Sequence, residues 1–158
     1  MSARLLTLRS FFENPIFLSA ISSWFLAQVL KALIVVLKPA RHPGRNVVKT
    51  FLWETGGMPS SHAALVVAMA LAVALRDGFG SDLFVVSFFL AMIVIRDAMG
   101  VRRSSGQQAK ALNVLGKLVA GKMGLEYLPV KEVYGHTPLE VAVGSLLGIF
   151  IACAYFYL

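Results

Sequence analysis

Two histidines stand where two apolar segments begin, and they are the side chains of this sequence best suited to chemistry. His62 closes the string GGMPSSH ahead of one apolar segment, and His136 lies just before Thr137 and Pro138, where another begins. One imidazole can attack phosphorus while a second protonates the leaving group. The free N–H groups at the start of a helix suit an anion. The pattern predicts a phosphate site at two helix N-termini; the alternative for His62 is a hydrogen-bonded interfacial histidine.

Four basic residues are candidates for neutralising such a phosphate. Lys31 lies inside an apolar segment, and Lys38 follows it by two helical turns, so both project to one face. The alternative for Lys31 is that its long stem reaches the membrane interface. Arg102 and Arg103 follow another apolar segment, where paired arginines also act as topological signals. Asp97 lies nearby at the end of that segment, and either arginine is a candidate partner for its carboxylate.

The residues around the two histidines also carry helix-start signals. Ser60 or Ser61 can cap a helix, which leaves its first N–H groups free for an anion. Thr137, Pro138 and Glu140 spell a capping box with proline at the first helical position. Capping alone is a sufficient explanation for the serines and for Glu140, but it leaves His136 unexplained.

The composition points to a membrane protein. Of the 158 residues, 58% are hydrophobic and only 15% are charged, against about 25% charged residues in an average soluble domain. Basic residues flank the apolar segments and give a net charge of +7, which favours anionic lipid headgroups as partners over nucleic acid. The single cysteine, Cys153, cannot form an internal disulfide.

The elements that must position these residues are predicted to be membrane-spanning helices. Four spans are expected at about residues 15–37, 60–76, 82–99 and 138–158, in a single membrane domain covering residues 1–158. Asn14 and Pro15 supply a start signal for the first span. Between the last two spans, Lys110, Asn113 and Lys117 share one face of an otherwise apolar segment, which suits an interfacial amphipathic helix. The expected fold class is an all-α integral membrane protein.

The distribution of basic residues predicts the orientation of the four spans. The first and third loops carry eleven lysines and arginines, whereas the N-terminal tail and the second loop carry three. The positive-inside rule places the first and third loops in the cytoplasm and both termini outside. All the candidate site residues then fall at the cytoplasmic side.

Three stretches of the sequence resemble the type 2 phosphatidic acid phosphatase superfamily, which includes the vanadium haloperoxidases. Its motifs are Lys-x6-Arg-Pro, Pro-Ser-Gly-His and Ser-Arg-x5-His-x3-Asp, and this chain has, in the same order, Lys31-x6-Lys38-Pro39, Pro59-Ser60-Ser61-His62 and His136-x3-Glu140. The longer strings GGMPSSHAALV, RDAMGVRRSSGQQAKALN and GHTPLEVAVG resemble the divergent branch, a group of small bacterial and plastid membrane proteins. The likeness runs from about Asn14 to the end of the chain.

The resemblance implies a role for each matched residue. His136 is similar to the nucleophile that forms a phosphohistidine, Glu140 to the acid that orients it, and His62 to the general acid for the leaving alkoxide. The implied phosphate ligands are Lys31, Lys38, Ser60 and the backbone at Ser61. The family needs no metal or other cofactor. A bacterial plasma membrane is the location that the resemblance favours.

This chain departs from the family motifs at four places. Lysine stands at 38 for arginine, serine at 61 for glycine, and glutamate at 140 for aspartate. The Ser-Arg pair of the third motif is absent, since Val130 stands six residues before His136, where the arginine would be, and Lys131 follows it. We infer that Arg102 or Arg103 supplies the missing guanidinium, because this group offers two parallel donors to a phosphate.

The expected function is a metal-independent phosphatase that acts on a lipid phosphate or diphosphate at the cytoplasmic face. Phosphatidate, phosphatidylglycerophosphate and polyprenyl diphosphate are all candidate substrates. One alternative is a non-catalytic membrane protein that binds anionic lipid or phosphate at the same site. A transporter using Gln28 and Lys31 is less favoured, because four spans without a repeat are few for alternating access. Two imidazoles on either side of one phosphate-sized space would support catalysis.

Overall fold

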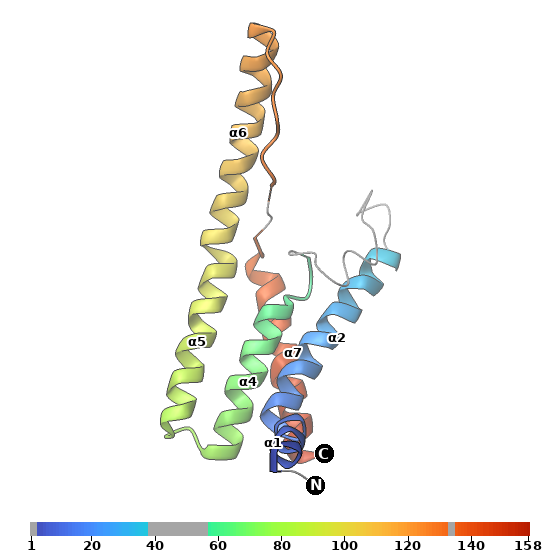
Figure 1. The fold of residues 1–158 in the computed structure, drawn as a ribbon, viewed down its shortest axis with the longest axis vertical. Coiled ribbons are helices and arrows are strands. Elements are labelled where there is room, and N and C mark those ends of the chain that lie inside the picture. The colour runs from blue at the N-terminus through green and yellow to red at the C-terminus, as the bar shows by residue number, and fades with distance from the viewer. Residues whose placement is uncertain (1–2, 38–56, 133–134) are drawn as a thin grey trace.

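The computed structural model describes residues 3–37, 57–132 and 135–158, and these residues form helices and connecting segments without any strand. The fold class is therefore all-helical, as the sequence predicts. Figure 1 shows a bundle from which one long helical rod projects. In chain order the helices are α1 (Ala3–Phe12), α2 (Pro15–Leu37), α4 (Ser61–Asp77), α5 (Asp82–Met99), α6 (Val101–Met123) and α7 (Pro138–Tyr157).

Small residues let the central helices of the bundle pack closely. Helix α4 lies in the middle and contacts α2, α5 and α7. On α2, α4 and α7, buried small residues recur at four-residue spacing, a pattern typical of helix pairs within membranes. They are Ser19, Ser23 and Ala27 on α2, Ala64, Ala68 and Ala72 on α4, and Gly144, Gly148 and Ala152 on α7.

Large apolar side chains lie on the outside of this bundle. Phe25 of α2, Val86 of α5 and Phe150 of α7 are more than half exposed, while the core consists largely of alanine. Within the described residues, three helical stretches are long and apolar enough to cross a membrane, namely Pro15–Leu37, Asp82–Met123 and Pro138–Tyr157. The remaining predicted span, at about residues 60–76, corresponds to α4, which is shorter, at 17 residues, and is enclosed by the other helices.

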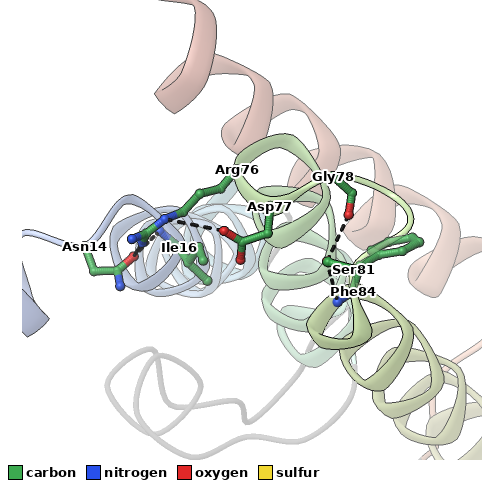
Figure 2. Close-up of polar contacts among 7 residues, drawn as sticks. All are labelled: Asn14, Ile16, Arg76, Asp77, Gly78, Ser81 and Phe84. Atoms are coloured by element: carbon green, nitrogen blue, oxygen red, sulfur yellow. Dashed lines mark hydrogen bonds and ion pairs between the residues drawn. The ribbon is translucent and has the colours of Figure 1, made fainter.

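Polar contacts fix the end of the bundle that lies away from the long rod (Figure 2). The Asn14 side chain caps α2 by accepting from the backbone N–H of Ile16 at 2.9 Å, and it also accepts from Arg76 at 3.0 Å. This contact joins the start of α2 to the end of α4. Ser81 caps α5 by accepting from the N–H of Phe84 at 3.2 Å. The predicted helix start at Asn14 is thereby confirmed.

The predicted amphipathic segment is a helix, but it does not lie across the bundle. Helix α6 follows α5 after Gly100 alone and continues in nearly the same direction, so that it extends beyond the other helices (Figure 1). Asn113 does not share an open face with Lys110 and Lys117, because it is buried. Its amide donates to the carbonyl of Val130 at 2.8 Å and accepts from the N–H of Val130 at 2.8 Å. Asn113 thus holds the returning segment against α6.

Candidate phosphate site

The two histidines line the same pocket. It lies where α4 and α7 begin and α5 ends, at the end of the bundle from which α6 projects (Figure 1). Its lining residues are His62, Val94, Asp97, Ala98, Arg102, Gly135 and His136. Residues from four separate stretches of the sequence therefore meet at one place. The imidazoles do not point to opposite sides of the protein, which would have excluded joint action on one phosphate.

His136 is held firmly by both its backbone and its ring. Its N–H donates to the carbonyl of Ala98 at 3.0 Å, and its side chain is almost fully buried. Nδ1 lies 3.1 Å from Oε2 of Glu140. When Nδ1 donates its proton to this carboxylate, the neutral ring carries its lone pair on Nε2. The ring is then oriented with Nε2 as the nucleophilic atom.

The surroundings of His136 favour the neutral imidazole. Burial lowers the pKa of His136, and the charges of Lys31 and Arg102 lower it further, whereas the hydrogen bond and the charge of Glu140 raise it in part. The net effect is a pKa below the ordinary value of 6.5. At neutral pH the ring is therefore uncharged, the state that a nucleophile needs.

Glu140 caps a helix and contacts His136 with the same oxygen. Its Oε2 accepts from the backbone N–H of Thr137 at 3.0 Å, and the Thr137 hydroxyl accepts from the N–H of Glu140 at 3.3 Å. This reciprocal pair is the predicted capping box, which the structure confirms. The capping role and the contact with His136 are therefore not alternatives, because one carboxylate serves both.

The serines at the start of α4 lie beside the pocket and do not line it. Ser60 is fully buried, and its hydroxyl accepts from the N–H of Ala63 at 3.4 Å, so the capping interpretation of Ser60 is confirmed. Its N–H donates to the carbonyl of Glu140 at 3.0 Å. Ser61 is also buried. The contact of Ser60 with Glu140 ties the start of α4 to the first turn of α7, which brings His62 toward His136.

The structure separates the predicted cations. Arg102 lines the pocket, and its Nε donates to Oδ2 of Asp97 at 2.7 Å. Arg103 does not line the pocket; its backbone instead lies against Gly135, where a Cβ would come within 2.7 Å of the Arg103 Cβ. Lys31 is 2% exposed on α2, and its charge acts on His136. Lys38 lies outside the described residues.

Asp97 binds one of the two arginines that the sequence offers as its partners. It lines the pocket beside both histidines and binds Arg102 through one of its carboxylate oxygens. The guanidinium uses its Nε edge for this bond, so its terminal N–H groups remain for an anion. The sequence leaves Arg102 and Arg103 open as partners of Asp97, and the helix that continues past Gly100 places Arg102 in contact with it.

A family model described as the Divergent PAP2 family, named for type 2 phosphatidic acid phosphatase, matches residues 12–151. The chain belongs to this family. The matched range includes all the pocket residues together with Lys31 and Glu140. The predicted resemblance to the divergent branch is thereby confirmed.

A curated relative supports the assignment of this Divergent PAP2 family member to the membrane. The chain is 36% identical over 154 residues to a protein described as the uncharacterized membrane protein YuiD of Bacillus subtilis strain 168, covering 89% of this chain and 94% of the relative. No solved structure matches the chain. The chain is thus a membrane protein, and the part of it that the structure describes contains three candidate membrane-spanning helices.

The pocket combines groups that suit phosphoryl transfer more than metal binding. Among the described residues of this family member, no cluster of three or more histidine, cysteine, aspartate or glutamate side chains could hold a metal ion. The pocket instead offers a neutral imidazole oriented by a carboxylate, a second imidazole and a guanidinium. These groups can attack a phosphoryl group, protonate a leaving group and bind phosphate oxygens.

Proposed function

We propose that the protein is a membrane-embedded phosphatase that hydrolyses a lipid phosphate or diphosphate through a phosphohistidine intermediate. The observation that carries this proposal is that both imidazoles line one pocket, with Nδ1 of His136 bound to Glu140. A protein that only binds anions has no need for a neutral, oriented imidazole at its centre. Membership of the Divergent PAP2 family adds to the support.

The proposed reaction proceeds in two displacements. In the first, Nε2 of His136 forms a bond to phosphorus while the bond from phosphorus to the leaving oxygen breaks, and His62, when it carries a second proton, gives that proton to the leaving oxygen. In the second, neutral His62 removes a proton from a water molecule, which attacks phosphorus and breaks the bond to Nε2. Inorganic phosphate leaves, and both imidazoles return to their starting states.

Cationic side chains stabilise the charge of the phosphoryl group during both steps. Arg102 is the pocket cation and donates through its terminal N–H groups, while Lys31 acts from α2. Lys38, Ser60 and Ser61 complete the proposed set of phosphate ligands, Lys38 from outside the described residues and the serines from beside the pocket. Arg103 does not line the pocket, because its backbone lies against Gly135, so it could join this set only after that segment moves.

The pocket must open before a phosphoryl group enters. Its volume is about 20 Å³, which suits roughly one water molecule. The Arg102–Asp97 pair lies in the exposed part of its wall, with the two side chains 46% and 39% exposed, and His62 is also exposed. We propose that this pair moves outward to admit the substrate and that the guanidinium then closes on the phosphate.

The membrane arrangement is part of the same proposal. Helices α2, α4, α5 and α7 form four spans of a single domain, with the first and third loops and the site at the cytoplasmic side of a bacterial plasma membrane. The bundle supports this arrangement, because α2 and α5 end and α4 and α7 begin at one end (Figure 1). Helix α6 then begins at the membrane surface, where its basic side chains meet anionic headgroups.

The experiment that tests the function is phosphate release by the purified protein from a panel of lipid phosphates and diphosphates, in the presence of a chelator. We expect turnover by the native protein and a loss of several orders of magnitude in His136→Ala. His42→Ala is the matched control, because no role is assigned to that histidine. Binding of lipid phosphates without turnover would instead establish the non-catalytic alternative.

A further inference from the structure

A second hollow, between α4 and α5, is lined by apolar side chains alone. Its volume is about 360 Å³. Its walls include Ala70 and Leu71 of α4, and Phe84, Phe88, Ala91 and Ile95 of α5. Because no charged or polar side chain lines this groove, its occupant must be apolar along its whole length.

Two alanines create the groove. Ala70 and Ala91 are buried where α4 meets α5, and they leave space between larger neighbours. On α5, the rings of Phe84 and Phe88 lie with their centroids 5.9 Å apart and form one wall. A hollow with this floor and wall differs from the outer helix surface, where apolar side chains simply project outward.

The groove and the phosphate pocket adjoin each other along α5. On α5, Ala91 and Ile95 line the groove, and Val94 and Ala98 line the pocket, so the two spaces occupy adjoining turns. On α4, His62 of the pocket lies eight residues before Ala70 of the groove, or about 12 Å along the helix axis. A molecule that places a phosphate between the histidines can therefore extend directly into the groove.

The groove extends along most of the length of α5. From Ile95 to Phe84 the helix descends eleven residues, or about 16 Å at 1.5 Å per residue. Ile95 lies four residues before the end of α5 at Met99, and Phe84 lies two residues after its start at Asp82, so a chain in this groove would run from near the pocket toward the opposite end of the span. The dimensions match a lipid chain whose headgroup stays at the surface.

We propose that the α4–α5 groove holds one hydrocarbon chain of the lipid whose phosphate enters the pocket between His62 and His136. This inference rests on the proposed function and narrows it, since it makes long-chain phosphorylated lipids the substrates and disfavours water-soluble phosphates. The groove determines substrate specificity through apolar contact with the hydrocarbon chain, and the reaction takes place in the pocket.

The test fills the groove and measures how chain length affects turnover. In Ala91→Phe, the ratio of kcat/KM for a long-chain monoacyl glycerol phosphate to that for glycerol phosphate should fall about tenfold, as expected when roughly two methylene groups lose their contacts. Ala70→Leu fills the groove from the other helix and should act in the same direction. Val86→Phe, on the exposed side of α5, is the matched control and should leave the ratio unchanged.

A crosslinking measurement separates failure of this inference from failure of the proposed function. A long-chain lipid phosphate with a photoreactive group in mid-chain should label α4 or α5, and Ala91→Phe should reduce the labelling even if the native protein shows no turnover. We expect an unlabelled lipid phosphate to compete with this labelling, whereas a phosphate-free lipid of equal chain length should not. Equal competition by both lipids would show ordinary bilayer lipid in the groove and overturn the inference. So would an unchanged chain-length ratio in both filled variants, or crosslinks between two copies of the protein through this groove.

Discussion

Glu140 links the start of α7 to the chemistry of His136 through a single oxygen, which accepts from both the Thr137 backbone and the imidazole. The Glu140→Gln substitution keeps an acceptor for the cap but removes the charge. We expect the variant to fold normally and to lose about ten- to a hundredfold in turnover, the size typical of a lost charge-assisted hydrogen bond. Phosphate release together with a melting curve in detergent checks this result. Loss of folding together with activity would show that Glu140 acts mainly as a cap.

The pH dependence of kcat/KM should report the lowered pKa of His136. The nucleophile must be neutral, and burial together with nearby cations lowers the pKa of His136 below 6.5. The acidic limb of the kcat/KM profile should therefore lie below pH 6.5. Since Glu140 raises this pKa in part, Glu140→Gln should move the acidic limb to still lower pH. An acidic limb above pH 6.5 in the native protein would contradict this assignment.

The two neighbouring arginines should respond differently to conservative substitution. Arg102 lines the pocket and Arg103 does not, while lysine preserves the charge that matters for topology. Arg102→Lys should weaken competitive inhibition by inorganic phosphate about ten- to a hundredfold, because the paired donors of guanidinium are lost. Arg103→Lys serves as the control and should behave like the native protein. Equal behaviour of the two variants would remove Arg102 from the phosphate site.

At the scale of the helices, close packing of α7 on α4 depends on glycine. A Cβ at Gly148 would lie 3.0 Å from the N of Ala68 and closer still to the carbonyl oxygen of Ala64. Gly148→Ala should therefore lower the melting temperature in detergent by pushing the two helices apart. At Gly121 of α6, where a Cβ meets nothing within 4 Å, the same substitution should be neutral or stabilising. Equal melting temperatures for the two variants would show that the helices adjust without cost.

The helix starts were predictable from the sequence because capping is local. Asn14 and Thr137 act as predicted, with partners within three residues of each. The direction of α6 was not predictable, since it depends on the backbone geometry at Gly100. That geometry also decides which of Arg102 and Arg103 faces the pocket. The four-residue spacing of Gly144, Gly148 and Ala152 is a signal of close helix packing that can be read from the sequence.

At the scale of the whole molecule, the site and the α4–α5 turn lie at opposite ends of the bundle (Figure 1). With Cys153 replaced by alanine, single cysteines at positions 45 and 117 should be protected from membrane-impermeant reagents in intact cells. A cysteine at position 80, in the turn between α4 and α5, should react. Reaction at position 45 or 117 would place the site on the outer face.

The proposed mechanism depends most on one covalent species, a phosphoryl group on Nε2 of His136. The most direct measurement is rapid acid-free quenching of the protein during turnover of a ³²P-labelled lipid phosphate, with chelator present, followed by peptide mapping. The proposed mechanism predicts an acid-labile, base-stable label on the peptide containing His136, and no label in His136→Ala. Turnover without any label on this histidine, or undiminished turnover in His136→Ala, would contradict it.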